Sequence, residues 1–521
     1  MSLSLDQLRQ LDDALWGRQV NRGFEILESV SDDLSHLAPE DPLAISYLLN
    51  VAQWVDLGYR DHQFLTMLVE RFANIDRTEM KLLEFLQLRL VEAFHSFAHE
   101  DVTTAIEILE TVLPSLPQVP DRRLTLMAHF WKGRAHRHKG EYALATAHIL
   151  QAKTLAIDLQ TPKLVAVIQV HESWLLFQAG QRKEAFRLLD DSEVELTSTG
   201  HALSLGNIAS ARGRFIRRSG EYGKALEYFQ SAISTYSQHF PCHPNLGRAL
   251  VNAAYVKRLI ALDLSHKVNE GRLRSQRDRY LRTCREALDL LERAREIYAL
   301  AEHRGGAGSV LVNAGHLHLD TGDIERASAE AVNAFEMGES NQDPILMARA
   351  RILQAAIHNV QVEEQVGDDD DLARHANSAA FCSEEAISLA KQTQNKRLLA
   401  GAYIARGTTA ANDFFEEWEM AKQFATLASE LLNSEDRDHL SKELRMLRSR
   451  ILRATGIDQT LRAWSDGMTG DKTFQQITEE FAEIVIPKVW LREDQKISRV
   501  AEKLSISPKK VRRILRNLPK P

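Results

Sequence analysis

Apolar residues recur along most of the chain at helical spacing, and this pattern itself repeats every 40 residues. The repeat is clearest where a glycine is followed five residues later by an alanine: Gly140 and Ala145, Gly180 and Ala185, Gly220 and Ala225. Glycine tolerates the positive φ just past a helix C-terminus, so each glycine is expected to end the first helix of a pair. Each alanine is expected on the second helix, where the two helices cross closely. A fixed period in this range is typical of a solenoid.

Two units carry further small and aromatic residues at matching positions. The better unit runs from Gly213 through Gly220, Tyr222 and Ala225 to Phe229 and Ala232, and a second has Gly315, Gly322, Ala327 and Ala334. Over most of residues 80–450 the chain resembles the tetratricopeptide repeat (TPR) family. The family unit has about 34 residues, so the longer period here implies helices nearly a turn longer, as in the TPR regions of ligand-responsive regulators such as peptide-pheromone receptors.

The periodicity divides the chain into four segments. Residues 1–78 are expected to form an N-terminal helical cap, with helices at Leu5–Trp16, Gly23–Ser29, Leu43–Leu57 and His62–Phe72. Residues 79–453 are expected to form the solenoid. Residues 454–472 are rich in Gly, Ser, Asp and Thr and are interpreted as a linker. Residues 473–521 form a separate C-terminal segment.

Several stretches inside the predicted solenoid depart from the regular register. Val102–Val112 fits a second helix, although Glu100 stands where the glycine would be. After Pro244, helices are predicted at Arg248–Leu264 and Arg274–Ala301. The run from His303 to Gly308 is interpreted as a turn between helices, and the acidic run at 367–371 as a solvated loop.

The C-terminal end carries a charge opposite to that of the rest of the chain. Residues 486–521 hold eleven Lys and Arg against three acidic residues, a net +8, whereas the whole chain carries −7 and the remainder therefore −15. This asymmetry is typical of a basic nucleic-acid module joined to an acidic body. The tail is also patterned: a helix is predicted from Phe474 to about Arg492, then a short helix with Ile497, Val500, Ala501 and Leu504 inward.

A second short helix follows the turn at 505–507. Ser507 caps it and Pro508 occupies its first position, where the missing N–H costs nothing. This segment resembles the Fis-type helix-turn-helix family, although Ser505 stands where that family usually has a glycine of positive φ. The resemblance implies DNA binding, and together with the repeats it implies an all-α fold: a right-handed TPR superhelical solenoid followed by a small helix-turn-helix domain. The DNA-binding candidates are Ser507, Lys509, Lys510, Arg512, Arg513 and Arg516.

A basic face favours DNA binding in such a module, because neutralising the phosphates supplies much of the affinity for DNA. Arginine can also form hydrogen bonds to the edge of guanine. A homodimer is one arrangement open to it, since two-fold dimers match palindromic half-sites. The alternative interpretation is a three-helix cap that closes the solenoid with its basic face against the acidic body.

The first helices of the repeats are expected to line a concave groove. Asn252 and Asn313 share one register position and could pair with a peptide backbone, since an amide both donates and accepts. Arg214, Arg217 and Arg258 are the basic candidates, with Arg134, Arg137 and Arg218 on the same face. Replacing both asparagines by alanine is expected to abolish ligand binding. The alternative is that the arginines form inter-repeat ion pairs and the asparagines pair locally.

The sequence shows no clear motif for a disulfide, a metal site or catalysis. Cys242, Cys284 and Cys382 have no disulfide or zinc spacing, and the His239–His243 cluster is interpreted as a loop. There is no Gly-x-x-x-x-Gly-Lys phosphate loop, and His136 and His138 lie beside Arg137 without a defensible nucleophile. We expect no catalytic residue, metal or cofactor, and no enzyme activity.

The N-terminus has no basic and apolar leader, and no apolar run approaches a membrane span of about 20 residues, so a cytoplasmic protein without membrane contact is expected. The sequence favours a DNA-binding transcriptional regulator whose solenoid binds a peptide, protein or small ligand. The alternative is a TPR scaffold or adaptor whose C-terminal module serves as a cap or protein contact.

Overall fold

The computed structural model describes residues 3–269, 274–455, 472–493 and 495–517. Throughout these residues the regular structure is helical, which confirms the expected all-α class. The chain forms two compact units, residues 1–444 and 445–521. Most of the predicted linker, residues 456–471, lies outside the described residues.

The N-terminal cap contains the four predicted helices, each ending within a residue of its expected bound, and one more short helix. Their bounds are α1 (Leu5–Trp16), α2 (Val20–Ser29), α3 (Ser31–Ser35), α4 (Ala44–Asp56) and α5 (His62–Arg71).

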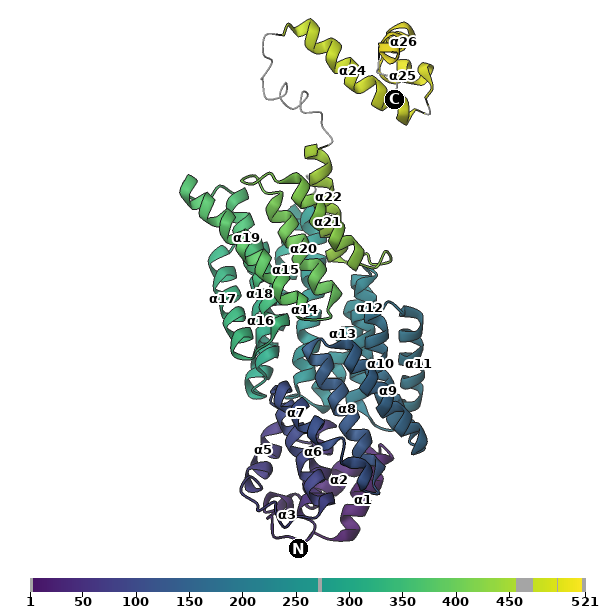
Figure 1. Cartoon of the computed structure of the whole chain (residues 1–521), viewed down its shortest axis with the longest axis vertical. Coiled ribbons are helices and arrows are strands. Elements are labelled where there is room, and N and C mark those ends of the chain that lie inside the picture. Colours follow the sequence, from purple (N-terminus) through teal and green to yellow (C-terminus); the bar gives the residue numbers. More distant parts are fainter. Residues whose placement is uncertain (1–2, 270–273, 456–471, 494, 518–521) are drawn as a thin grey trace. The chain divides into compact units, whose positions relative to one another are not determined.

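Antiparallel helix pairs follow one another through the rest of the larger unit (Figure 1). The pairs are α6 (Leu82–Ala98) with α7 (Val102–Val112), α8 (Arg122–Lys139) with α9 (Tyr142–Asp158), α10 (Pro162–Gln178) with α11 (Arg182–Thr197), α12 (Ala202–Arg218) with α13 (Tyr222–His239), α14 (Pro244–Asn269) with α15 (Arg274–Leu300), α16 (Arg304–Asp320) with α17 (Ile324–Ser340), α18 (Pro344–Glu363) with α19 (Asp369–Lys391), and α20 (Lys396–Ala410) with α21 (Trp418–Leu431). A 3₁₀ turn at Leu116–Gln118 precedes α8, and α22 (His439–Thr455) ends the series.

The glycine and alanine positions of the repeat do what the sequence predicted. Gly140 and Gly220 both have φ near +80°, and Glu100, which replaces the glycine in an earlier repeat, has φ 65°. The repeat alanines are fully buried where the helices of a pair cross. A Cβ on Gly213 would come within 2.8 Å of the Phe229 ring, so only glycine allows that close approach. The repeat signal therefore encodes both the turn and the crossing.

Three expectations about irregular stretches were wrong or incomplete. Gly305 to Gly308 do not form a turn: His303 caps α16, accepting a hydrogen bond from the Gly306 N–H, and the glycines occupy its first turns. The acidic run opens α19, where Asp368 is the N-cap and carboxylates in the first turn favour the positive end of the helix dipole. The α14 helix begins at Pro244, four residues before the expected Arg248.

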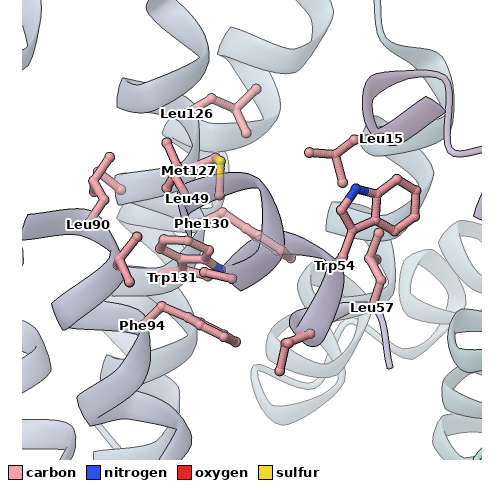
Figure 2. Packing of buried hydrophobic residues seen from close by; sticks show 14 of the residues in the cluster. Leu15, Leu49, Trp54, Leu57, Leu90, Phe94, Leu126, Met127, Phe130 and Trp131 are labelled. Carbon is pink, nitrogen blue, oxygen red and sulfur yellow. The ribbon is translucent and has the colours of Figure 1, made fainter. Parts of the chain in front are cut away.

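A continuous apolar core joins the cap to the first repeats. Trp54 of α4 and Trp131 of α8 are fully buried, and Phe94 of α6 stacks on Trp131 with 4.8 Å between ring centroids (Figure 2). The Trp131 Nε1–H donates to Asp56 at 3.1 Å, which satisfies the one polar atom of this large side chain. Because α1, α4, α6 and α8 all contribute to this core, the cap is an integral part of the larger unit.

The smaller unit contains three helices after its first segment: α24 (Phe474–Arg492), α25 (Ile497–Lys503) and α26 (Pro508–Asn517). Their shared core buries Val500 and Ala501, as predicted, together with Ile486, Val511 and Ile514. Ser505 adopts φ 50° between α25 and α26, so this serine takes the left-handed conformation that the turn requires. The Ser507 hydroxyl accepts a hydrogen bond from the Lys510 N–H, which confirms its role as a cap.

No helix in the described residues is both long and apolar enough to cross a membrane.

Candidate functional site

The first helices of the repeats surround a cavity of about 600 Å³, here called the central groove, in the larger unit. Helices α12, α14, α16, α18 and α20 and the start of α22 supply its lining. The groove is strongly cationic: its arginines are Arg214, Arg217, Arg218, Arg248, Arg258, Arg349 and Arg397. A smaller cavity of about 200 Å³, the inner chamber, lies between the cap and the first repeats and shares Arg214 and Arg248 with the groove.

Some arginines on this face have acidic partners. Arg258 is 7% exposed and forms a two-point ion pair with Asp320, with Nε 2.5 Å and Nη2 3.0 Å from the carboxylate oxygens. Arg134 pairs with Asp56 at 2.5 Å. The structure thus places Arg258, a predicted ligand residue, in the inter-repeat ion pair that the alternative interpretation expected.

Other arginines of the groove and chamber have no carboxylate within 4.0 Å among the described residues: Arg137, Arg214, Arg217, Arg218, Arg248 and Arg349. Their contacts are neutral. Arg217 donates to Asn252 Oδ1 at 3.1 Å and lies 4.8 Å from the centre of the Tyr255 ring. Arg218 donates to Gln178 Oε1 at 2.8 Å. The Nε of Arg214 is buried without a hydrogen-bond partner.

Burial and neighbouring positive charges lower the pKa values of Arg137 and Arg214. The pKa of Arg137 falls to about 9, first because it is removed from bulk water and then because Arg248, Arg214 and Arg134 are near. The same two causes lower the pKa of Arg214 to about 10. Both side chains remain charged at neutral pH, so the inner chamber, which both of them line, holds positive charge without a carboxylate partner.

The two predicted asparagines lie in the groove and use their amide nitrogens locally. Asn252 Nδ2 donates to the Arg248 carbonyl at 2.8 Å, and Asn313 Nδ2 donates to the Ser309 carbonyl at 2.7 Å. Each bond reaches back four residues along its own helix. Register identity between the two positions is therefore real, and the Asn252 oxygen also orients Arg217.

Repeats far apart in sequence meet and close the solenoid on itself. The Gln394 N–H donates to the Gly140 carbonyl at 3.0 Å, and the Arg437 N–H donates to the Arg218 carbonyl at 2.9 Å. These closure contacts tie the ends of α8 and α12 to the turns before α20 and α22 and so complete the wall of the central groove.

An ion-pair network reinforces the closure. Asp436, whose side chain is 2% exposed, pairs with Arg182 and, at 2.6 Å, with Arg397. Arg397 also pairs with Asp438. The Asp436 carboxylate thus connects α11, α20 and the segment that leads into α22.

Among the described residues no group of three or more His, Cys, Asp or Glu is placed to hold a metal ion, and the three cysteines are free. His136 pairs with Glu141 and stacks on His148, whereas His138 lines the groove and the inner chamber. His243 lies in the loop between α13 and α14, where its Nδ1 accepts from the Asn245 N–H.

In the smaller unit, taken by itself, the basic residues of α26 lie on its outer side. Lys509, Arg512, Arg513 and Arg516 are exposed and Lys510 is half-buried, while Val511 and Ile514 face the core. Arg513 forms an exposed ion pair with Glu479 of α24 at 2.6 Å. The arrangement leaves a continuous cationic strip opposite a buried apolar strip.

Sequence reasoning missed Arg248, Arg349 and Arg397. The predicted groove arginines of α8 and α12 fall toward the ends of those helices, whereas Arg248 and Arg349 lie near the starts of α14 and α18. A usable signal existed for one of them: Arg349 donates to Ser309, which precedes it by one 40-residue period.

These features define a TPR-like helical-repeat solenoid with a cationic groove. No family model and no curated protein matches the sequence. A Rap protein solved with Competence and Sporulation Factor is similar in fold, with 15% identity, a TM-score of 0.52, and coverage of 74% of this chain and 98% of Rap.

Two other solved structures align less well. The quorum sensor NprR from B. thuringiensis has 13% identity and a TM-score of 0.43, covering 82% of this chain and 98% of NprR. The human IFIT1 dimer with m7Gppp-AAAA has 15% identity and a TM-score of 0.45, covering 82% of this chain and 96% of IFIT1.

Proposed function

We propose that this chain is a DNA-binding transcriptional regulator that acts by binding rather than by catalysis, and whose solenoid binds a peptide, protein segment or small ligand. The observation that carries the DNA-binding part is the exposed basic strip of α26, presented by a helix pair whose turn residue, Ser505, has positive φ. Such a helix can enter the major groove while its flanking cations neutralise phosphates.

The ligand-binding part is supported by the charge of the central groove. Five arginines without acidic partners in the described residues line this groove, whose size suits a small ligand or a peptide segment. The Rap protein, similar in fold, was solved in complex with Competence and Sporulation Factor, so a solenoid of this kind can hold a partner.

The DNA-binding proposal is tested with the full chain, duplex DNA and a pair of matched variants. Lys509→Glu/Arg512→Glu reverses two exposed charges on α26, and the control Lys183→Glu/Lys224→Glu reverses two exposed lysines on α11 and α13. Wild type and control are expected to bind with strong salt dependence, and each lost phosphate contact should reduce the slope of log affinity against log salt by about 1. Affinity that is flat with salt, or equal loss in both variants, would contradict DNA binding through α26.

A scaffold or adaptor is the second candidate, and one observation favours it. Arg513 is already paired with Glu479, and Lys503 with Glu493, so part of the positive charge is neutralised within the unit. Genome-wide recovery of bound DNA, with and without Arg512→Glu/Arg513→Glu, separates the candidates. A scaffold would recover no defined sites with either chain.

A further inference from the structure

The inner chamber and the central groove meet at a cluster of cations from three first helices. Arg137 comes from α8, Arg214 from α12 and Arg248 from α14, and all three line the inner chamber. They are close enough that Arg248 and Arg214 are the two charges that most depress the pKa of Arg137. Residues from repeats separated in sequence therefore converge on one place.

The carboxylates of the inner chamber are already engaged elsewhere. Asp56 binds Arg134 and the Trp131 indole. Glu100 Oε2 accepts from the Gly305 N–H at 2.8 Å, and Glu100 Oε1 lies 2.9 Å from His303 Nδ1. Neither can neutralise the three-arginine cluster without abandoning a partly buried contact.

The buried polar atoms of the chamber lining that have no hydrogen-bond partner include Arg214 Nε and His171 Nδ1. His171 comes from α10, between the helices that carry Arg137 and Arg214. Burial and the arginines around it, Arg137 first, then Arg134, Arg248 and Arg214, hold its pKa well below the usual value, so it is neutral. A neutral imidazole can donate one hydrogen bond without adding charge, and buried polar atoms in folded proteins are nearly always satisfied.

Apolar side chains also line this chamber. Phe97, Leu126, Phe130 and Leu164 contribute to the lining, and Leu126 and Phe130 are seen in Figure 2. The volume of about 200 Å³ is comparable to engineered apolar cavities of roughly 150 Å³ that accept benzene. The chamber therefore suits one apolar group next to a concentrated positive charge.

We propose that Arg137, Arg214 and Arg248 bind a single oxyanion group, a carboxylate or a phosphoryl group, whose apolar substituent occupies the inner chamber against Phe130 and Leu164. The inference rests on the proposed function in one respect, that the solenoid binds a ligand, and it specifies that ligand's chemistry. Planar guanidinium groups bind such oxygens through paired N–H donors, which lysine cannot reproduce. The oxyanion supplies the negative charge that the surrounding side chains lack.

The test uses the full chain and small probes, with binding followed by calorimetry. N-acetyl-phenylalanine carries the carboxylate, phenyl phosphate carries the phosphoryl group, and N-acetyl-phenylalanine amide is the uncharged control. At least one acid is expected to bind in a saturable manner, about tenfold or more tighter than the amide. Whichever acid binds more tightly identifies the source of the oxyanion.

Arg214→Gln and Arg248→Gln are each expected to weaken the preferred acid by about tenfold. Arg349→Gln is the matched control: it removes another arginine of the central groove without an acidic partner, outside the chamber, and should change binding less than twofold. Misfolding is not expected to confuse the result, because removing one of several crowded cations should leave the melting temperature unchanged or higher. A fall in melting temperature together with lost binding would contradict the proposed charge crowding.

The inference is overturned if neither acid binds, if the amide binds as well as the acids, or if the two chamber variants bind like wild type. These failures differ from failure of the proposed function. DNA binding measured without any probe can succeed while the probes fail, and arginine-dependent probe binding can succeed in a chain that binds no DNA.

Discussion

Removing the Asp436 carboxylate should open the closure of the solenoid. The side chain is 2% exposed, and its two arginine partners, Arg182 and Arg397, are 15% and 19% exposed. Taking one partner from a buried ion pair costs about 3–5 kcal/mol. Here each arginine keeps a second carboxylate, since Glu435 lies 3.7 Å from Arg182 and Asp438 pairs with Arg397. We therefore expect Asp436→Ala to destabilise the closure by about 2 kcal/mol.

Native-state hydrogen exchange is the appropriate assay, because repeat arrays open locally and a single unfolding free energy is poorly defined. The Arg437 amide, which donates to the Arg218 carbonyl, reports the closure directly. A loss of about 2 kcal/mol should accelerate its exchange by roughly thirtyfold. Amides in the core of α8 should be unaffected.

Two further variants serve as an intermediate case and a control for Asp436→Ala. Asp436→Asn keeps the shape and one acceptor and should lie between wild type and Asp436→Ala. Glu435→Ala removes a neighbouring carboxylate that is 72% exposed, and it should cost less than about 0.5 kcal/mol. If Asp436→Ala leaves exchange at Arg437 unchanged, the ion pairs do not hold the closure and the energetic reasoning is wrong.

Three further predictions follow from single positions. His201 is 1% exposed, and burial lowers its pKa to about 3. Because the unfolded chain binds the proton more readily, the contribution of this residue to stability is complete above pH 6.5 and has fallen by about 2 kcal/mol at pH 5. The melting temperature of His201→Leu should therefore fall less steeply on acidification than that of the wild type. Gly220→Ala should lower the melting temperature more than Gly322→Ala. Both glycines have φ near +80°, but only at Gly220 would the added Cβ meet a backbone oxygen, that of Arg437, at 2.9 Å. Arg258→Ala should destabilise by about 3–5 kcal/mol by leaving Asp320 buried and unpaired, and recovery in Arg258→Ala/Asp320→Ala would confirm the pair, whereas equal loss in both variants would contradict it.

Local signals were sufficient for the helices and their crossings. A positive-φ glycine such as Gly140 and a crossing alanine such as Ala145 act within one helix pair, so a single sequence contains what is needed to place them. Even Glu100 could be placed in the glycine position by register alone, and its φ of 65° agrees. The cap and core residues of the smaller unit, Ser507 and Val511, were predictable for the same reason.

Contacts between distant repeats were not predictable in this way. Gln394 bonds to Gly140 across about 250 residues, and nothing in the period of 40 indicates which turns will meet after the superhelix has curved. The same limit explains Arg258: its register position pointed to the groove, but its partner Asp320 lies 62 residues on, in the next repeat. The acidic partner of an arginine determines whether that arginine is free to bind a ligand, and the curvature of the array determines which side chains become partners.

The pattern of paired and unpaired arginines distinguishes folding from binding as the cause of the groove's charge. Arginines that hold the fold together are paired with a carboxylate, as Arg134 is with Asp56 and Arg258 with Asp320. The three-arginine cluster has no such partner in the described residues. Burial and then the nearby arginines, Arg248 foremost, lower the pKa values of Arg137 and Arg214, so these two charges are held against repulsion. A chain shaped by stability alone would replace such residues with neutral ones, because each uncompensated charge makes the closed solenoid less stable. We therefore attribute the cluster to an anionic ligand, whose binding would remove the repulsion and stabilise the closed solenoid.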